Sequence, residues 1–444
     1  MAQFFPLSEE QTSLLFLDRL FGPGIFHNNN YTLRLDAETF PKVSYDDVRA
    51  AVTDLLESQE ALRTGLVAGS PFVQELGPPE AHLTSRTVYD EAPSAYTDRR
   101  AGELHNAELH PREVPARARF EYAEDPAGQH KALLIATDHL VSDGISSGLV
   151  RSRLHAYLQA RQNGEKPPAS EPAGYAALCR DRHPGTEAQA REVAHWNRKL
   201  GNVEPLRGLA ATPRGDLQRT QVDRGTAGPA RYDEVNLLTG RYEASPFAVV
   251  ATLVGCALWR RTGRRRFLLH TPMSTRRDES AQAAVGYFVN DRPVLCEVDP
   301  DQPLADAFRA MMAAAWNAGR HSTLSVPRLA AEVPAYGASL LEPGIDYVQL
   351  HVWMSQVPSN RYRGPVDWRE EIVHGPFRPA RDLRVTTLRY RFCPQETFDR
   401  TFFAGPADGI HEATAVSDDV LTLLRAAAGT EVSTIGALAQ TLRS

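Results

Sequence analysis

Short segments of the chain carry strand patterns in both of its halves. In residues 31–36, Thr32 and Arg34 alternate with apolar residues, which is typical of a half-buried β-strand. Residues 116–123 and 131–137 flank the turn-rich residues 124–128 and predict an antiparallel hairpin. Further strands are expected at 267–270, 294–298, 347–354 and 383–392.

Helical signals stand between these strands. Ser8 and Gln11 form a capping-box arrangement at the start of a helix that runs to about Leu20. Ser245 and Pro246 suit the N-cap and first position of an unusually apolar helix that we expect to be buried. Further helices are expected at 45–57, after Gly144, at 304–318, and from an N-cap at Ser417 to about Ala428. Mixed strands and helices in both halves predict a two-lobed α/β or α+β architecture.

The length of 444 residues exceeds the usual size of one compact core, so two domains are expected. Residues 163–168 and about 203–230 are polar, contain Gly and Pro, and have the composition of linkers. We assign a first domain to residues 1–178 and a second to residues 179–444.

The amino-acid composition indicates in which cellular environment the protein is expected. Hydrophobic residues make up 42% of the chain and charged residues 23%, with no apolar run long enough to cross a bilayer and no signal-peptide pattern at the start. Four scattered cysteines lack zinc-site spacing, so we expect reduced, buried thiols and no metal. These features predict a cytoplasmic protein that does not enter the membrane.

The net charge of −6 argues against a general role in binding nucleic acid. One dense basic run, residues 260–266, is expected to keep a turn after a helix exposed to solvent. Docking of an acidic partner is the alternative for this run.

The candidate chemistry lies at residues 138–144. His139 can accept a proton at neutral pH and return it, as a general base requires. If the preceding strand stays extended, Asp138 and His139 point to opposite sides. Asp143 and Gly144 suit a helix cap and a tight turn, while backbone N–H groups at that helix start could stabilise an oxyanion.

Residues 138–144 resemble the H-H-x-x-x-D-G signature of the condensation-domain superfamily of nonribosomal peptide synthetases, which includes free-standing acyltransferases. Other segments resemble further motifs of this family in the family's order: Pro6 to Gln11, Glu60 to Thr64, His270 to Arg276, and Gly286 to Asn290. Together they span about two-thirds of the chain.

The resemblance implies tandem chloramphenicol-acetyltransferase-like lobes that form a V-shaped pseudodimer. It implies that His139 is catalytic, that Gly144 contributes its backbone N–H, and that Asp143 is structural and pairs with Arg276. Candidates for lining the substrate channels are Ser146, Asn290, Trp353 and Ser355. The substrate would be an acyl group on the phosphopantetheine arm of a carrier protein, and no bound cofactor is implied. The acceptor would be an amine or hydroxyl of a small molecule or of a second carrier-bound group.

Two departures from the family pattern leave alternatives open. Asp138 replaces the first motif histidine, and the family's late D-F-G-W-G segment is not recognisable. Asp138, Asp143 and Ser146 also satisfy the D-x-x-x-x-D-x-x-S pattern of heterocyclization domains. A catalytically silent recruitment domain is a further alternative. Because the chain shows no carrier attachment motif or adenylation domain, we expect a free-standing enzyme whose donor and acceptor arrive in trans.

Overall fold

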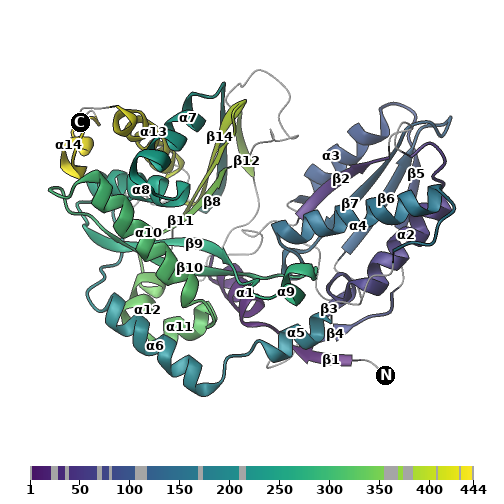
Figure 1. The fold of residues 1–444 in the computed structure, drawn as a ribbon, viewed down its shortest axis with the longest axis horizontal. Helices are drawn as coiled ribbons and strands as arrows, with labels where there is room; N and C mark the ends of the chain where they lie inside the picture. Colours follow the sequence, from purple (N-terminus) through teal and green to yellow (C-terminus); the bar gives the residue numbers. More distant parts are fainter. Residues whose placement is uncertain are drawn as a thin grey trace. The chain divides into compact units, whose positions relative to one another are not determined.

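The computed structural model describes residues 3–21, 29–35, 40–67, 73–79, 83–105, 118–168, 174–209, 217–354, 369–373, 384–406, 409–429 and 432–442. The chain forms two compact units, whose elements are labelled in Figure 1. The first comprises Met1–Asp18, Pro23–Pro184 and Ser274–Val289, and the second comprises Arg19–Gly22, Gly185–Met273 and Asn290–Ser444. Residues 274–289 therefore belong with the first unit, although the sequence assigned them to the second domain. The cause is a buried ion pair between this segment and Asp143, described below.

The first unit combines helices with a four-stranded sheet, β2-β7-β6-β5, and a three-stranded sheet, β1-β4-β3. Its strands are β1 (Gln3–Pro6), β2 (Asn29–Arg34), β3 (Thr64–Val67), β4 (Val73–Leu76), β5 (Leu83–Thr87), β6 (Ala118–Glu124) and β7 (Lys131–Thr137). Its helices are α1 (Glu9–Phe21), α2 (Tyr45–Ser58), η1 (Glu60–Arg63), α3 (Pro93–His105), η2 (His139–Val141), α4 (Gly144–Gln162), α5 (Tyr175–Asp181) and α9 (Glu279–Ala283). β6 and β7 pair antiparallel, which confirms the predicted hairpin.

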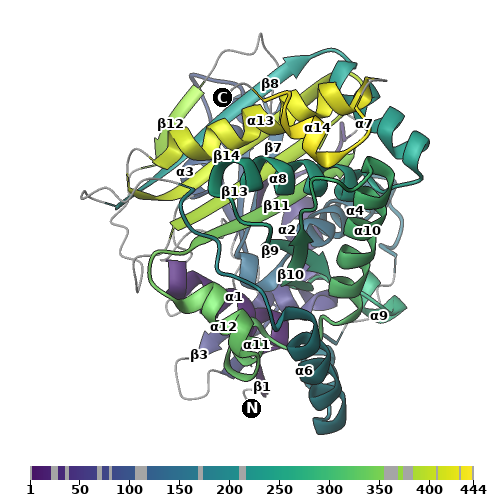
Figure 2. The ribbon, with the colours of Figure 1, turned by 90° about the vertical axis from the view of Figure 1, so that its left-hand side faces the viewer.

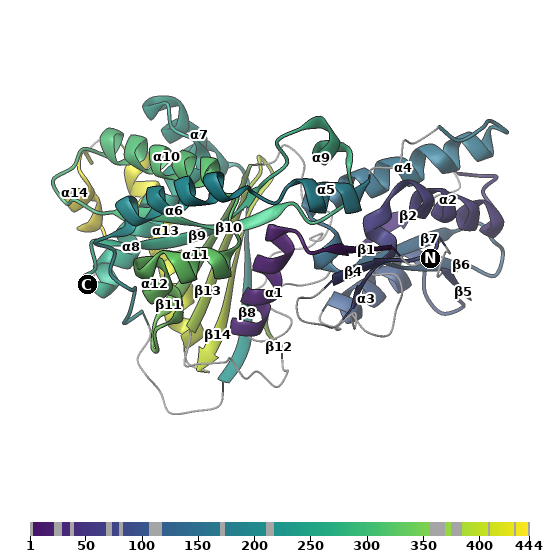
Figure 3. The ribbon, with the colours of Figure 1, turned by 90° about the horizontal axis from the view of Figure 1, so that it is seen from below.

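Strand β7 is buried on both faces. Leu133 and Ile135 join the core that also contains residues of α2 and α4, whereas Leu134 and Ala136 pack with Ala101 of α3. Figure 3 shows α2 and α4 on one side of this sheet and α3 on the other. The C-terminal end of β7 is therefore held by packing from both sides.

The predicted capping box at the start of α1 is present. The Ser8 backbone N–H donates to Gln11 Oε1 at 2.9 Å, and the Gln11 N–H donates to Ser8 Oγ at 3.1 Å. The pair satisfies two amides that the start of a helix leaves without intrahelical acceptors. The predicted start of this helix is confirmed.

The second unit contains a seven-stranded sheet with the order β10-β9-β11-β13-β14-β8-β12. Its strands are β8 (Leu217–Ala227), β9 (Arg266–Ser274), β10 (Val289–Glu297), β11 (Asp346–Met354), β12 (Arg369–Val373), β13 (Arg384–Phe392) and β14 (Glu396–Pro406). Its helices are α6 (Thr186–Leu200), α7 (Ala230–Tyr242), α8 (Pro246–Thr262), α10 (Leu304–Arg320), α11 (Val326–Glu332), α12 (Pro334–Leu341), α13 (Gly409–Ala428) and α14 (Ile435–Ala439). Figure 2 shows α8 and α13 side by side, and the two helices are in contact.

Helix α8 matches the sequence prediction closely. Ser245 caps it by accepting from the Ala248 N–H at 3.1 Å, and Pro246 is its first residue. Its residues from Ala248 to Leu258 are all buried. Among the described residues, no single helix has the length and hydropathy needed to cross a bilayer.

Two sequence predictions for the second unit are wrong. Ser417 is not an N-cap, because α13 already begins at Gly409 and Ser417 lies buried within it, donating to Asp399 Oδ2 at 3.0 Å. The supposed linker at 203–230 contains β8, which pairs with β14 and β12. Ladder hydrogen bonds on both sides stabilise this polar segment as a strand despite its loop-like composition.

The basic run at 260–266 comprises the last three residues of α8 and the turn after this helix. Gly263, with φ of 70°, caps α8 in the left-handed conformation. Arg261 pairs with Asp419 at 2.7 Å, and Arg264 and Arg266 pair with Glu204 and Glu297. These arginines are therefore neutralised within the unit.

Polar side chains are buried on three adjacent strands of the second unit. Asp291 on β10 accepts hydrogen bonds from the Tyr347 hydroxyl and, at 3.3 Å, from Gln349 Nε2, both on β11. Burial raises the pKa of the Asp291 carboxyl to about 7. Burial also lowers the pKa of His270, on the intervening strand β9, to about 3.

Asp291 makes the stability of the protein depend on pH. The pKa of its carboxyl is 3.8 in the unfolded chain and about 7 in the folded chain. The free energy of unfolding therefore falls as the pH rises from 3.8 to about 7. Asp291→Asn removes the ionisation and keeps an oxygen for the Tyr347 hydroxyl. At pH 8 we expect Asp291→Asn to raise the melting temperature and to increase the free energy of unfolding by at most about 4 kcal/mol. At pH 4 we expect little effect. Thermal unfolding followed by circular dichroism, with the exposed Asp301→Asn as control, checks this; a variant less stable than the parent at pH 8 contradicts it.

Candidate active site

The chain leaves β7 at Thr137 and turns through the short helix η2 into α4. Strand β7 ends at Thr137 and η2 begins at His139, so the expected alternation of Asp138 and His139 along a strand does not reach His139. Instead, Asp138 is the N-cap of η2, where its Oδ1 accepts from the Leu140 N–H at 2.7 Å. The side chain at the first motif position therefore stabilises the turn that carries His139.

The contacts of the His139 imidazole include a hydrogen bond and a ring contact. Its Nδ1 lies 2.8 Å from the carbonyl oxygen of Ser142. Because a carbonyl only accepts, Nδ1 carries the proton and Nε2 has the lone pair in the neutral ring. The ring of Tyr287 meets the imidazole edge to face, with centroids 5.2 Å apart and planes at 81°. This tautomer can take a proton at Nε2.

Backbone and hydroxyl contacts hold the turn around His139 in place. Ser142 Oγ lies 2.7 Å from Thr137 Oγ1 and donates to the Asp138 carbonyl at 3.2 Å. The Leu140 carbonyl accepts from Gln11 Nε2 of α1 at 3.0 Å. Thus both α1 and the end of β7 position the turn.

Asp143 begins helix α4. Its Oδ1 accepts from the Ser146 N–H at 2.8 Å and lies 2.9 Å from Ser146 Oγ, and Asp143 is the N-cap. Gly144 is the first residue of α4, so its N–H has no acceptor within the helix and lies at the positive end of the helix dipole. A helix start follows His139 by five residues.

Asp143 and Arg276 form a buried, two-pronged ion pair. Arg276 Nε lies 3.1 Å from Asp143 Oδ2, and its Nη2 lies 2.9 Å from Oδ1 and 3.0 Å from Oδ2. Both side chains are 2% exposed. Arg276 also donates to the carbonyls of Ala281 and Ala284 and stacks over Phe288 at 4.2 Å. Such complete pairing is what allows two charges to be buried together.

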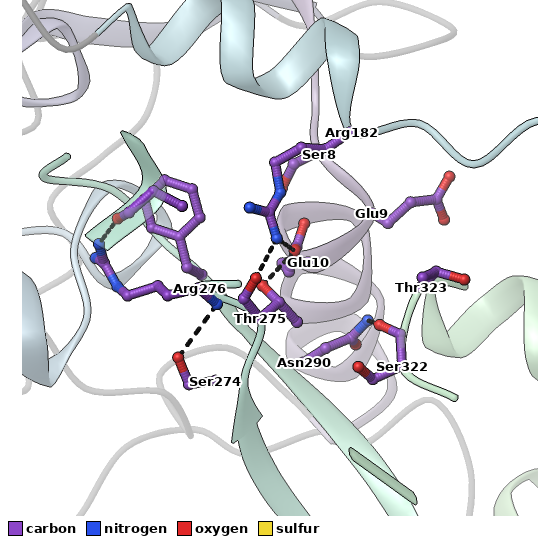
Figure 4. Close-up of polar contacts among 12 residues, drawn as sticks. Ser8, Glu9, Glu10, Arg182, Ser274, Thr275, Arg276, Asn290, Ser322 and Thr323 are labelled. Carbon is purple, nitrogen blue, oxygen red and sulfur yellow. Dashed lines mark hydrogen bonds and ion pairs between the residues drawn. The ribbon is translucent and has the colours of Figure 1, made fainter. Parts of the chain in front are cut away.

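The chain on the N-terminal side of Arg276 is anchored to α1. Thr275 Oγ1 donates to Glu10 Oε1 at 2.5 Å, and Arg182 donates to the Thr275 carbonyl. Figure 4 shows Thr275 between Glu10 and Arg182, with Ser274 and Arg276 beside it. These contacts explain why residues 274–289 pack with the first unit.

Ser146, a predicted channel residue, is wholly buried. Its Oγ donates to the Gly286 carbonyl at 2.8 Å and accepts from the Gly286 N–H at 3.0 Å. Arg276 Nη2 lies 2.9 Å from the same hydroxyl. Ser146 therefore links α4 to the segment that carries Arg276.

The other channel candidates lie in the second unit or outside the described residues. Asn290 is fully buried, and its Nδ2 donates to the carbonyls of Leu324 at 3.0 Å and Ser322 at 3.3 Å (Figure 4). These bonds join β10 to the residues after α10. Trp353 on β11 is 48% exposed, with its ring 5.2 Å from that of His351. Ser355 lies outside the described residues.

Sequence reasoning missed the roles of Tyr287 and Gln11. Both lie within segments that carry the family resemblance. Nothing in their spacing indicates that Tyr287 contacts the His139 ring or that Gln11 donates to the Leu140 carbonyl. Within the part of the chain that the structure describes, no three His, Cys, Asp or Glu side chains are grouped as a metal site would require. All four cysteines are free and buried.

Comparison with known proteins identifies the class. The profile of the condensation domain matches residues 1–349. The chain is 24% identical over 350 residues to the beauvericin nonribosomal cyclodepsipeptide synthetase of Beauveria bassiana, covering 75% of this chain and 10% of that protein. It is 28% identical over 315 residues to phosphinothricin tripeptide synthetase PhsC of Streptomyces viridochromogenes, covering 68% of this chain and 28% of that protein. It thus spans a small part of these relatives.

The fold agrees with a solved member of this class. The first condensation domain of the CDA synthetase superposes with a TM-score of 0.71 at 17% identity, covering 98% of both chains. The mixed α/β fold predicted from the sequence is confirmed, while the V-shaped arrangement of the lobes stays a prediction. The chain belongs to the condensation-domain family.

The contact between Gly286 and its neighbours yields a stability prediction. A Cβ at Gly286 would lie 2.4 Å from Tyr175 Cε2 and 2.7 Å from Phe288 Cε2. Gly286→Ala should therefore destabilise the first unit by about 1–3 kcal/mol through overpacking. The matched control is Gly148→Ala in α4, where a Cβ meets nothing within 4 Å and alanine should stabilise the helix by up to about 1 kcal/mol. Urea unfolding curves measure both, and equal effects of the two substitutions would refute the prediction.

Proposed function

We propose that this protein transfers an acyl or aminoacyl group from a carrier-protein thioester to an amine or hydroxyl, forming an amide or ester. Membership of the condensation-domain family supports condensation chemistry in general. The observation that carries the specific proposal is the tautomer of His139. Its Nδ1 is hydrogen-bonded to the Ser142 carbonyl, which places the lone pair of the neutral ring on Nε2, the atom that accepts a proton in this proposal.

The proposed step is an addition followed by an elimination. The acceptor nitrogen or oxygen attacks the thioester carbonyl carbon while His139 Nε2 takes the proton of the nucleophile. The carbonyl oxygen becomes an oxyanion, which the Gly144 N–H stabilises at the start of α4. The tetrahedral intermediate then collapses, the C–S bond breaks, and the imidazolium returns the proton to the departing thiolate.

In this proposal Asp138, Asp143 and Arg276 position the reacting groups without touching them. Asp138 caps the turn of His139, and the pair of Asp143 and Arg276 fixes the start of α4 that presents Gly144. These structural contacts explain why Asp138, Asp143 and Ser146 are present, so the three residues need no role in cyclisation. A heterocyclization product would be lighter by one water, so the mass of the product separates the two activities.

The proposed donor is an acyl group on the phosphopantetheine arm of an acyl or peptidyl carrier protein. The acceptor is a small molecule or a second carrier-bound group. The arm is part of the substrate, and the reaction as proposed uses no bound cofactor. A cytoplasmic location and delivery of both substrates in trans remain predictions from the sequence.

The role of His139 can be tested with phosphopantetheinyl thioesters of acyl and aminoacyl groups and a panel of amines and alcohols. His139→Ala should lower kcat by about 10²- to 10⁴-fold, because it removes the general base. The control His130→Ala lies in the exposed turn of the β6–β7 hairpin and should leave turnover unchanged. Condensation product is quantified by mass spectrometry, and full turnover by a folded His139→Ala variant overturns the proposal.

The role of the Gly144 amide permits a sharper test. Asp143 has φ of −124° and ψ of −177°, an extended conformation that a following proline accepts, and a Cβ at Gly144 meets nothing within 4 Å. Proline is tolerated at the first helical position and removes only the N–H. Gly144→Pro should therefore lower kcat by about 10²- to 10³-fold, whereas Gly144→Ala, which keeps the N–H, should not. Equal activity of the two folded variants would exclude this N–H as the oxyanion donor.

A further inference from the structure

The second unit contains a cavity of about 260 Å³ that the proposed reaction does not use. It lies among α6, α8, β10, α10 and Ile435 of α14, and Figure 3 shows α6, α8 and α10 in the same unit. Every residue that lines it belongs to the second unit, whereas His139, Asp143 and Gly144 belong to the first. It is therefore a separate cavity with its own chemistry.

The body of the cavity is apolar. Leu295 of β10 and Met311 and Ala314 of α10 contribute to its wall. Cys256 and Cys296 line it as well, and burial raises the pKa of each thiol to about 12, so both stay uncharged. An apolar cavity of about 150 Å³ is large enough for benzene. This larger cavity can hold an aromatic ring that carries a short substituent.

Positive charge and hydrogen-bond donors are gathered at one side of the cavity. His195 and Lys199, four residues apart on α6, share one helix face and both line the cavity. The carboxylate of Glu297, also in the lining, pairs with Arg266 and so is compensated. The ammonium of Lys199 is therefore the uncompensated charge among these groups.

His195 adds a buried polar atom to this side. Its Nε2 is buried and has no hydrogen-bond partner among the described residues. Its ring stacks on that of His321 with centroids 3.5 Å apart and planes at 12°. Burial, His321, Arg198 and Lys199 lower the pKa of His195, while Glu192 opposes the shift. A neutral imidazole that lines the cavity has one ring N–H that can donate to an anion.

We propose that this cavity is a binding site for a small aromatic carboxylate. The ring would occupy the apolar space beside Met311 and Ala314, and the carboxylate would accept from Lys199 and His195. A carboxylate suits this side because it only accepts hydrogen bonds and carries the opposite charge. The proposal is independent of the activity assigned to His139.

Phenylacetate, with the neutral amide phenylacetamide as matched ligand, tests the site in the full-length protein by isothermal titration calorimetry. We expect saturable binding of phenylacetate at one site and at least tenfold weaker binding of phenylacetamide. Ala314→Phe, which fills the cavity, and Lys199→Gln, which removes the cation, should each weaken phenylacetate binding at least fivefold. Bound phenylacetate should also raise the melting temperature, because it binds only the folded state.

Three control variants distinguish this cavity from other binding sites. Ala315→Phe lies on the same helix outside the cavity lining, Lys166→Gln removes an exposed lysine of the first unit, and His139→Ala alters the proposed active site. All three should bind phenylacetate as the parent does. The proposal is overturned if binding is absent, if phenylacetamide binds equally well, or if His139→Ala weakens binding while folded Ala314→Phe does not.

Discussion

The buried ion pair of Asp143 and Arg276 joins two parts of the first unit that are 133 residues apart in the chain. Two opposite charges removed from water stabilise a fold only when their hydrogen-bonding capacity is filled. Here the carboxylate also caps α4 through Ser146, and the guanidinium also donates to the Ala284 carbonyl and stacks on Phe288. The segment 274–289 consequently packs with the first unit, although the chain before and after it belongs to the second.

The same pair governs the geometry of the candidate active site. Asp143 sets where α4 begins, and so where the Gly144 amide lies. His139 precedes Gly144 by five residues and is oriented through the Ser142 carbonyl and the Tyr287 ring. Tyr287 follows Gly286, which is bonded to Ser146 in both directions. The imidazole and the helix start are therefore held by one continuous set of contacts.

The cost of burying a charged group also shapes the second unit, where burial favours the neutral forms of two side chains. Its adjacent strands β9 and β10 bury His270 and Asp291, and burial shifts the pKa of each in the direction that favours the neutral form. The cavity beside α6 differs because the Lys199 side chain at its side is exposed. Burial therefore favours the neutral form on β9 and β10, whereas the exposed ammonium group of Lys199 lies where a ligand could contact it.

The sequence by itself determined the local features of this protein. The capping box of Ser8 and Gln11, the buried helix after Ser245 and the β6–β7 hairpin follow from residues close together in the chain, and so does the family resemblance around His139. These could be predicted because caps, turns and periodicity depend on near neighbours. The residue types of the candidate site could also be read directly from the sequence.

The tertiary structure alone decided which groups meet and which are buried. It ended β7 before Asp138, buried Ser146 and Asn290, placed Ser417 inside a helix against Asp399, and made a strand of the polar residues of β8. Each of these outcomes depends on a partner distant in the chain, such as Gly286 for Ser146 or β14 for β8. Local patterns carry no record of such partners, because hydrogen bonding and burial are settled only when distant segments pack together.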